Sequence, residues 1–567
     1  MNILGIGGYS HDSAAALVCD GKLVAAVAEE RLSRIKHQGG PPRLAVQYCL
    51  DAAGLKIDEI DYVTCYMQPM ARMARRIPYR LSRVFQSPYY AIAYAGYEVL
   101  HNAQYMRDMR SLCGPRARLI PVEHHPAHAA SAFLVSPYER AALLSVDYVG
   151  EWNATWMGVG EGTRMKHLQS ESYPNSLGLF YTGLTDYLGF LRASDEYKVM
   201  GLASYGEPEF LDEFRKILQI RPNGRYQIDL SWLKAHFMPG PVDGYFSDKF
   251  IKRFGPRRKK GEPLTAHHQN IAASAQRAME EVVLSMAAHL HKQTGLDRLC
   301  LAGGVALNCS MNGRLLRESP FNEIFVQPAA GDDGIAIGGA FQLYHKLTGK
   351  PRCFELHDAR LGPAYGNDAI KEFLDRAKLP YERPASIVGR AAELLAQGLI
   401  VGWYQDRMEF GPRALGSRSI LADPTRPDMK DLINKYVKHR EEFRPFAPSC
   451  LEEHASEYFE GCTKSPFMLF TYPVINEQRD RVPAITHIDG TARVQTVSKD
   501  VNPQYHALIR AFERLRGVPM VLNTSFNVMG EPIVNTPSDA VRCFYATGMD
   551  ALVIGDFVLQ KRPSGTA

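Results

Sequence analysis

Short apolar runs alternate with turn and helix signals over the first 65 residues. The pair Asp20-Gly21 is a strong hairpin signal, and a helical spacing of apolar positions ends at Gly54. The pattern predicts strands over residues 3–7, 14–18, 23–27 and 62–65, and a helix over 44–53. Such mixing of strands and helices is typical of an α/β domain.

Regular patterns return after residue 120, with predicted strands over 141–146 and 297–301 and a helix over 270–294 that ends at Gly295. Two stretches are less patterned. Residues 67–112 carry Arg72, Arg75, Arg76, Arg80 and Arg83 among many Met and Tyr residues and favour helices, either with a solvated amphipathic face or as a cap over a ligand cavity. Residues 222–265 favour a surface insertion, and we expect their basic run, 257–260, to be solvated.

A second α/β region follows residues 347–366, which favour a linker. Ser386 is placed to cap a helix, and the apolar pattern continues to the end of the chain. It predicts helices over 386–397 and 537–547 and strands over 399–404, 493–497, 520–522 and 551–559. A chain of 567 residues is too long for one core. We therefore predict two α/β domains, 1–350 and 367–567, with a linker over 351–366; no internal sequence repeat is evident.

Composition narrows the class of protein. The chain has 66 basic and 61 acidic residues, far from the excess of a dedicated nucleic-acid-binding protein, so no nucleic-acid partner is expected. Its ten cysteines form no C-x-x-C pair, which argues against a zinc ribbon and for a reducing compartment. Neither a membrane span nor a signal peptide is evident, so we expect a cytoplasmic location. The sequence does not indicate an oligomeric state.

The clearest local signal is the run EHHPAHAA. His124 and His128 are four residues apart, so on a helix both imidazoles would lie on one face, with Pro126 tolerated in the first turn. This spacing suits a shared metal, although by itself it more often belongs to an ordinary polar helix start.

Two acidic segments strengthen the metal interpretation. Asp147 ends an apolar strand, and Asp332 lies in a Gly-flanked acidic loop before a helix of small residues. Each carboxylate alone would also suit a helix cap or a salt bridge. Two His and two Asp together form an N/O ligand set without thiolate, which suits Fe²⁺, Mn²⁺ or Zn²⁺ with open coordination positions.

Glycine and arginine mark candidate anion sites. The run LAGGVALN predicts a strand, a Gly303-Gly304 turn and a helix, which can bring backbone N–H groups to a phosphate or simply form a tight turn. In the second domain several cations and polar loop residues fit phosphate recognition, although a surface role is the alternative for any single arginine. They are Arg413, Lys438, Arg440, Arg444, Arg493, Ser525 and Asn527.

Taken together, these motifs resemble the carbamoyltransferase family of NodU and TobZ type. The matching segments are SHDSAAALV, EERLSRIKH, EHHPAHAASAF, EYKVMGLASYG, LAGGVALN, GDDGIAIGGA, FGPRALGSRSILADP, FRPFAP and LNTSFNVMGEPIV, in the family's order along nearly the whole chain. The resemblance implies an actin/hexokinase-like N-terminal domain, similar to TsaD enzymes, and a YrdC-like C-terminal domain.

The activity that the resemblance implies is ATP-dependent O-carbamoyl transfer. The C-terminal domain would make carbamoyl-adenylate from carbamoyl phosphate and ATP with Mg²⁺. The N-terminal domain would pass the carbamoyl group to a hydroxyl of a small-molecule acceptor, such as a sugar or natural product, beside Fe²⁺ or another divalent metal. Because the intermediate is a reactive mixed anhydride, we expect the two sites to face each other across a shared channel. Acceptor specificity is expected in residues 67–112 and 222–265.

Site residues follow from the matched motifs. The resemblance implies metal ligands at His124, His128, Asp147 and Asp332, and an adenylate pocket at Gly303, Gly304 and Asn308, with Lys198 near it as a catalytic candidate. It implies that carbamoyl phosphate and ATP are held by Arg413, Lys438, Arg444, Arg493, Ser525 and Asn527. His11 is the candidate for contacting or deprotonating the acceptor. Tyr148 follows Asp147 where the family pattern leads us to expect Gly.

Three other functions remain open at this stage. A tRNA threonylcarbamoyltransferase would share the N-terminal motifs, although the charge balance and the second domain argue against it. A hydrogenase-maturation carbamoyltransferase acting on a thiol would be expected to carry C-x-x-C zinc fingers. A non-catalytic nucleotide-binding scaffold would not need intact ligand and arginine motifs in both domains.

Overall fold

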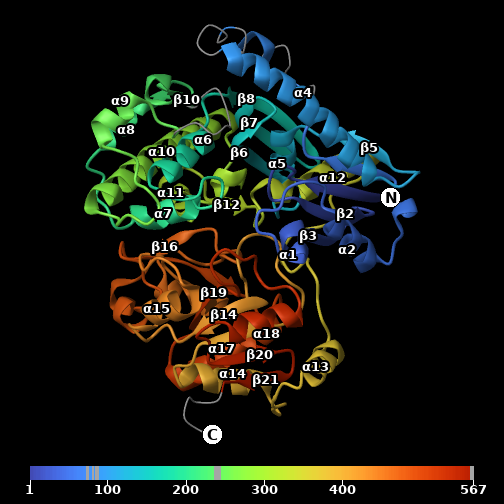
Figure 1. Ribbon diagram of the computed structural model, residues 1–567, viewed down its shortest axis with the longest axis vertical. Helices are drawn as coiled ribbons and strands as arrows, with labels where there is room; N and C mark the ends of the chain where they lie inside the picture. Colours follow the sequence, from blue (N-terminus) through green and yellow to red (C-terminus); the bar gives the residue numbers. More distant parts are fainter. Residues whose placement is uncertain (70, 72–75, 80–81, 83–87, 235–243, 562–567) are drawn as a thin grey trace.

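A computed structural model describes residues 1–69, 71, 76–79, 82, 88–234 and 244–561, with only the backbone of 88–99. Figure 1 shows two lobes stacked along the long axis. The upper lobe, blue to yellow, holds the elements from β1 to α12, and the lower lobe, yellow to red, holds those from α13 to β21.

A five-stranded sheet forms one half of the upper lobe, in the order β3-β2-β1-β4-β5. The first three strands are antiparallel neighbours, and β4 and β5 continue parallel to β1. The predicted strands and the helix over 44–53 are confirmed. The bounds are β1 Asn2–Gly7, β2 Ala14–Cys19, β3 Lys22–Ala28, β4 Tyr62–Cys65, β5 Arg118–Pro121, α1 Glu29–Ser33 and α2 Arg43–Ala53.

The second sheet of the upper lobe repeats this topology. Its order, β12-β11-β6-β7-β8, again has three antiparallel strands followed by two parallel ones. The chain thus duplicates an α/β unit without repeating its sequence, which confirms the actin/hexokinase-like class expected for this part. The bounds are β6 Arg140–Gly150, β7 Asn153–Glu161, β8 Arg164–Ser172, β11 Arg298–Ala302 and β12 Glu323–Val326.

Two helices lie between the sheets and join them. Helix α12 (Ile335–Thr348) packs on β1 and β2 and on α5 (His124–Phe133), and α5 packs on β6 and β11. Small residues permit this closeness: a Cβ on Gly338 would lie 1.9 Å from the carbonyl oxygen of Ala127, and one on Gly5 would lie 1.8 Å from that of Ala336. The small-residue helix predicted after the acidic loop is therefore a close-packing element.

The stretch 222–265 differs from the surface insertion that we expected. Phe246, Phe250 and Phe254, spaced four residues apart, are buried in the upper-lobe core, and Arg258 is buried as well. We predicted a surface segment here because glycine, proline and basic residues dominate the composition around these three phenylalanines. Elements around it are α6 Leu177–Tyr187, α7 Glu196–Ala203, α8 Leu211–Ile217, β9 Leu218–Arg221, β10 Arg225–Ile228, α9 Asp248–Phe254, α10 Ala266–Thr294 and α11 Cys309–Glu318.

The lower lobe is built on a seven-stranded mixed sheet, in the order β18-β15-β19-β14-β13-β20-β21. Ser386 caps α14 as predicted, since its hydroxyl accepts from the N–H of Gly389 at 3.1 Å. The bounds are β13 Val401–Tyr404, β14 Arg418–Ala422, β15 Ala447–Leu451, β18 Gln495–Val497, β19 Met520–Ser525, β20 Ala551–Ile554, β21 Phe557–Gln560, α13 Asn367–Arg376, α14 Ile387–Ala396, α15 Met429–Leu432, α16 Ala455–Tyr458, α17 Pro503–Arg516 and α18 Pro537–Tyr545.

Two predicted strands of this lobe are each divided in two. The predicted strand 493–497 is divided between two sheets. Arg493 is the last residue of β17 (Thr491–Arg493), which pairs with β16 (Thr471–Pro473), and residues 495–497 form β18 of the large sheet. Residues 551–559 form a hairpin of β20 and β21 that turns at Gly555. Apolar runs gave no sign of either break, because both halves are buried.

Residues 67–112 contribute the long helix α4 (Pro88–Ser111), which anchors on the first sheet through the buried side chains of Tyr105 and Met109. Four of the arginines singled out there, Arg72, Arg75, Arg80 and Arg83, lie outside the described residues. Within the described part of the chain, no helix is both long enough and apolar enough to cross a membrane.

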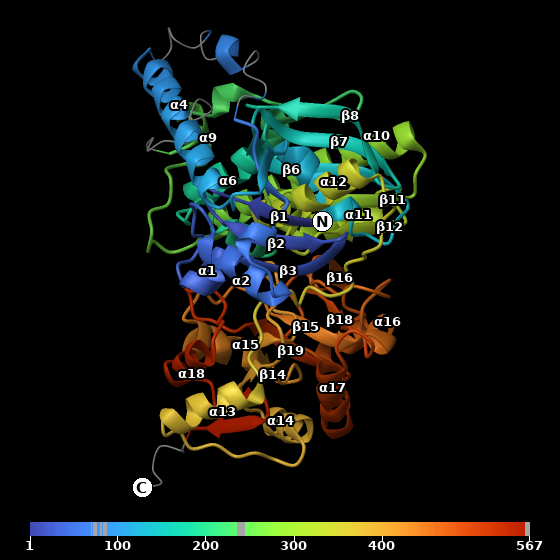
Figure 2. The same ribbon diagram turned by 90° about the vertical axis from the view of Figure 1, so that its right-hand side faces the viewer.

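Side chains of the upper lobe dock onto main-chain carbonyls of the lower lobe. Arg31 and Arg34, in and just after α1, donate to the carbonyl oxygens of Gly411 and Pro532, each at 2.9 Å. Figure 2 shows α1 facing the lower lobe at the junction. In the opposite direction, Arg413 of the lower lobe donates to the carbonyl of Leu307 at 3.2 Å. Of the residues that form these bonds, all except Arg34 also line a large cavity between the lobes.

Candidate active site

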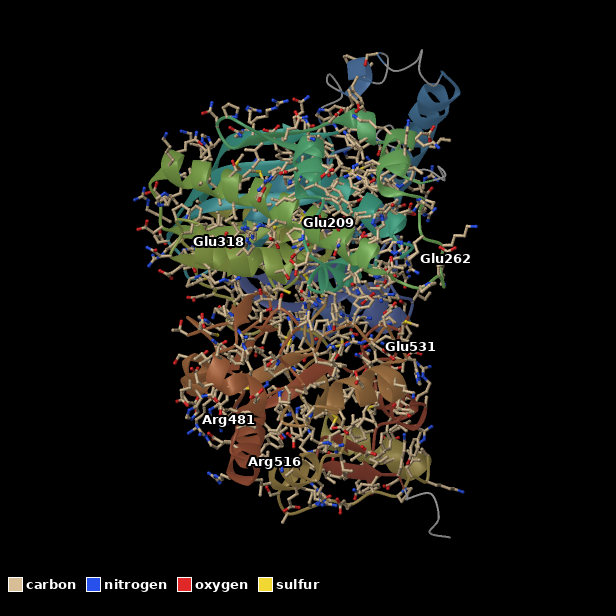
Figure 3. All side chains as sticks on the ribbon, turned by 90° about the vertical axis from the view of Figure 1, so that its left-hand side faces the viewer. Glu209, Glu262, Glu318, Arg481, Arg516 and Glu531 are labelled. Carbon is tan, nitrogen blue, oxygen red and sulfur yellow. The ribbon has the colours of Figure 1, made fainter. Side chains whose placement is uncertain are left out.

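One cavity of about 1600 Å³ lies where the lobes meet, and both lobes line it. Glu262 of the upper lobe and Glu531 of the lower lobe border it from the same side of the molecule in Figure 3. Of the candidate residues, all line this cavity except three that lie behind its wall, Gly303, His124 and His128. The lining candidates are His11, Asp147, Lys198, Gly304, Asn308, Asp332, Arg413, Lys438, Arg444, Arg493, Ser525 and Asn527.

The four residues proposed as metal ligands converge at the upper wall. Nε2 of His124 lies 2.9 Å from Oδ2 of Asp147 and 3.6 Å from Oδ1 of Asp332. Nε2 of His128 lies 3.4 Å and 3.5 Å from the same two oxygens. All four ligand atoms lie within 4.8 Å of one another. This is the compactness that a single ion requires.

Burial and charge balance also fit a cation. His128 is fully buried, and neither of its ring nitrogens has a hydrogen-bond partner among the described residues. Burial alone would lower the pKa of His128, but the carboxylates of Asp147 and Asp332 raise it to about 9. Burial would likewise raise the pKa of Asp147, yet the two imidazoles hold it well below its usual range. Two buried carboxylates facing two imidazoles form a donor set suited to a divalent ion.

Local backbone geometry explains how these ligands are positioned. His124 is the first residue of α5, so both ligand histidines project from the start of that helix. His125 points elsewhere, because its ring nitrogens lie 2.9 Å from Ser145 Oγ and from the carbonyl oxygen of Asn153. A Cβ on Gly150 would lie 2.2 Å from the His124 ring, so glycine is needed there.

The Gly303-Gly304 turn holds Asp147 in place. The N–H of Gly304 donates to Oδ1 of Asp147 at 2.9 Å, which leaves Oδ2 for the histidines. Gly303 has φ +90°, and a Cβ there would lie 2.2 Å from the carbonyl oxygen of Val146. Asn308 caps α11 through the N–H of Met311 at 3.0 Å. The turn therefore braces a candidate ligand, and Gly304 and Asn308 also line the cavity.

His11 stands at the end of a hydrogen-bonded chain that the sequence analysis did not find. Its Nδ1 lies 3.1 Å from Asp12, whose other oxygen lies 2.8 Å from Nδ1 of His37, and Nε2 of His37 lies 2.9 Å from Ser194 Oγ. Burial lowers the pKa of His11, but the bond to Asp12 and the charge of Asp332 outweigh it and raise the pKa to about 9. Asp12 lies in the motif SHDS and His37 in the motif RIKH, but neither motif indicates that these two side chains contact each other.

The lower wall of the cavity carries an arginine cluster with too few counter-charges. The Nε groups of Arg413 and Arg493 are buried and have no hydrogen-bond partner among the described residues. Burial and the nearby charge of Arg493 lower the pKa of Arg413 to about 9. Arg440 lies close by, with its pKa lowered by burial and by Arg444. Crowded guanidinium groups with unused N–H donors suit a multiply charged anion such as a phosphate.

Lys438, Ser525 and Asn527 form one network beside this cluster. The Lys438 ammonium donates to the carbonyl of Ser525 at 2.6 Å and to Oδ1 of Asn527 at 2.7 Å. Burial holds the pKa of Lys438 well below its usual range. The structure thus brings together three of the six lower-lobe residues that the resemblance grouped.

Lys198 lies at the border between the two walls. Its ammonium lies 2.9 Å from Glu441 of the lower lobe and 3.1 Å from Asp195. Its neighbour Tyr197 lies under Arg444, whose guanidinium carbon is 4.5 Å from the ring centroid. Sequence reasoning missed Tyr197 and Glu441, because no pattern links residues that are more than 240 positions apart.

The basic run 257–260 is not simply solvated. Arg258 is buried, and its Nε donates to the carbonyl of Leu188 at 2.7 Å, while Arg257 pairs with Asp186 at 2.7 Å. Arg257, Lys259 and Lys260 keep the exposure that we expected, and Arg258 does not. All four residues line the cavity, whereas no described residue of 67–112 does.

Comparison with known proteins matches both parts of the chain to one family. Residues 2–341 match the model of the carbamoyltransferase N-terminus, and residues 392–561 match that of the carbamoyltransferase C-terminus. The chain is 42% identical to an uncharacterized protein of Synechocystis sp., over 99% of this chain and 97% of that protein. It is 42% identical to nodulation protein NolNO of Sinorhizobium fredii, over 98% and 79%. It is also 27% identical to 3′-hydroxymethylcephem-O-carbamoyltransferase of Amycolatopsis lactamdurans, over 97% and 98%.

The ranges matched by the two family models lie in the two lobes and include every candidate residue that lines the shared cavity. This chain belongs to the carbamoyltransferase family of enzymes and carries both its N-terminal and its C-terminal parts.

Proposed function

We propose that this enzyme is an ATP-dependent O-carbamoyltransferase that activates the carbamoyl group in its lower lobe and transfers it in its upper lobe. The single observation that carries the proposal is the shared cavity, which joins an arginine cluster to a His/Asp cluster. We take residues 1–350 as the transfer domain and 367–567 as a YrdC-like activating domain, with 351–366 as the linker.

Activation would use the lower wall. Water releases phosphate from carbamoyl phosphate and leaves carbamate; a carbamate oxygen then attacks the α-phosphorus of Mg²⁺-ATP, and pyrophosphate leaves. The product is carbamoyl-adenylate. Arg413, Arg444 and Arg493 would bind the phosphate oxygens, because their charges crowd one another without an anion. Lys438, Ser525 and Asn527 would shape the loop beside them.

Transfer would use the upper wall, with Gly304, Asn308 and Lys198 beside the adenylate. The acceptor oxygen attacks the carbamoyl carbon, the bond to AMP breaks, and the hydroxyl proton passes to Nε2 of His11. Fe²⁺ or another divalent ion held by His124, His128, Asp147 and Asp332 would supply Lewis acidity toward the carbonyl oxygen.

The acceptor is proposed to be a small molecule with a free hydroxyl. The named activity of the cephem relative is transfer to such a group. The charge balance of +5 does not suggest a nucleic acid. A panel of hydroxyl compounds, scored by mass spectrometry for the gain of one carbamoyl group, would identify the acceptor class.

The division of labour is tested with one variant in each wall. Arg444→Ala should abolish carbamoyl-phosphate-dependent conversion of ATP to AMP. His124→Ala should retain carbamoyl-phosphate-dependent exchange of labelled pyrophosphate into ATP, because that exchange reports activation alone. Exposed Lys371→Met, at the far end of the lower lobe, is the matched control. Equal loss of exchange in Arg444→Ala and His124→Ala, with both variants folded, would disprove the proposal.

A further inference from the structure

The activating site of the lower lobe is not built by the lower lobe alone. Helix α7 of the upper lobe inserts Tyr197 and Lys198 beside Arg444 and Glu441. We propose that these two residues are positioning residues of the activating site: Lys198 holds Glu441 away from Arg444, and Tyr197 holds the Arg444 guanidinium open to phosphate. This inference rests on the proposed function.

Glu441 is a carboxylate in a site that must take an anion. Its Oε1 accepts from Lys198 at 2.9 Å, and its Oε2 is buried with no hydrogen-bond partner among the described residues. That oxygen lies 4.0 Å from NH1 of Arg444, which makes a long ion pair but no hydrogen bond. A small rotation would therefore let Glu441 pair with Arg444 and occupy the donors that carbamoyl phosphate or ATP needs.

Lys198 is placed to prevent that pairing. Its side chain is only 9% exposed and contacts both Asp195, the residue just before its own helix, and Glu441 of the other lobe. Because both carboxylates attract the ammonium, Lys198 has little freedom to leave. Without its positive charge, the nearest cation for Glu441 is Arg444.

Tyr197 acts on Arg444 from the other side. The guanidinium lies over the ring at 4.5 Å, an arrangement that stabilises the cation through its face and leaves the N–H edges free for an anion. The hydroxyl of Tyr197 is bound to Asp195 at 3.3 Å, which fixes the ring. Together the two residues make phosphate binding in the lower lobe depend on the docked upper lobe.

The test uses full-length protein and needs no acceptor. The readout is carbamoyl-phosphate-dependent pyrophosphate–ATP exchange, measured as a function of carbamoyl phosphate concentration. Lys198→Met should raise the half-saturating concentration about 10- to 100-fold, the size expected when one charge-assisted hydrogen bond is lost. The double variant Lys198→Met/Glu441→Gln should recover most of that loss, because the neutral amide does not compete for Arg444. A purely structural role for Lys198 would give no such recovery.

Tyr197 provides a second, independent arm. Tyr197→Phe keeps the aromatic face but loses the bond to Asp195, so it should weaken carbamoyl phosphate binding much less than Tyr197→Leu, which loses the face as well. Lys371→Met, which breaks an exposed Lys–Asp pair, controls for loss of an ion pair.

The outcomes separate this inference from the proposed function. Exchange that survives Arg444→Ala would overturn the proposed function itself. Exchange that is lost in Arg444→Ala but unchanged in Lys198→Met, or a Lys198→Met defect that Glu441→Gln does not relieve, would overturn the positioning role while leaving the proposed function intact.

Discussion

Nε2 of His124 lies 2.9 Å from Oδ2 of Asp147, although one residue begins a helix and the other lies 23 positions later in a strand. Helix α5 packs on β6, so the contact is a direct result of how the second sheet is covered. Two further elements complete the cluster: the Gly303-Gly304 turn braces Asp147, and the acidic loop before α12 supplies Asp332. Four separate segments thus converge on one point.

We expect purified protein to hold about one divalent ion per chain and His128→Ala to lose it, because that imidazole offers a ring nitrogen with no other partner. Elemental analysis of both proteins measures the difference. His167→Ala, at an exposed position of strand β8, is the control and should keep the ion. Equal metal content in the wild type and His128→Ala would contradict the ligand assignment.

The two glycines of the turn should respond differently to a methyl group. Gly303→Ala places a Cβ at positive φ and against the Val146 carbonyl, so unfolding free energy should fall by about 2 kcal/mol or more. In Gly304→Ala the nearest atom to the new Cβ is Oδ1 of Asp147 at 2.9 Å, so the substitution should displace a candidate metal ligand. We therefore expect a clear loss of bound metal and only a small fall in the free energy of unfolding. Gly366→Ala has open space around it and is the control. Urea unfolding and elemental analysis together distinguish the three variants, and an unaffected Gly303→Ala would disprove the argument.

His11 should titrate unusually high in metal-free protein and lower once a cation is bound. Its folded pKa of about 9 lies above the ordinary value near 6.5. Its contribution to stability is therefore complete below about pH 6.5 and is lost as the pH rises through about 9. Because Asp332 and Asp147 contribute to the upward shift, Zn²⁺ loading should lower the pKa and populate the neutral imidazole that a base requires. NMR titration of ¹³C-labelled histidine, assigned with His11→Asn, measures both states; an unchanged pKa on loading would contradict this coupling.

The intermediate should pass between the walls without leaving the protein. A mixture of Arg444→Ala and His124→Ala chains should recover little transfer activity, because each chain lacks one half-reaction and the cavity encloses both sites. Mass spectrometry of the carbamoylated acceptor measures the recovery. Efficient complementation at dilute protein, or interception of the carbamoyl group by hydroxylamine at the wild-type turnover rate, would show that it escapes.

Local structure was largely predictable from the sequence, because the signals are local. The Asp20-Gly21 turn and the Ser386 cap each act within a few residues, and the structure has both where the sequence predicted them. Predictions were wrong where apolar runs hid a break, as at Gly555, or where composition hid an apolar face, as at Phe250. The two sheets of the upper lobe share one strand order although their sequences do not repeat. A strand order can be kept by any residues that preserve which positions are buried, so similar residues are not required.

For the site, the resemblance supplied the residues but not their relations. His37 completes a chain with Asp12, and Glu441 pairs with Lys198, through contacts that span 25 and 243 positions. Neither periodicity nor spacing carries information at that range. The Gly303-Gly304 turn shows the same limit, because a phosphate cradle and a brace for a neighbouring carboxylate require the same two glycines.

The docking of the lobes through main-chain carbonyls has an evolutionary consequence. Arg31 and Arg34 bind the carbonyl oxygens of Gly411 and Pro532, and a main-chain oxygen does not depend on the side chains around it. Gly411 itself must remain glycine, because it has φ +108° and a Cβ there would lie 2.7 Å from the carbonyl oxygen of Pro328. The loops of the lower lobe that border the cavity can therefore exchange side chains without removing these acceptors. Such an architecture lets a lineage diversify the rim of the cavity, and with it the compounds admitted, while the two walls of the cavity stay in register.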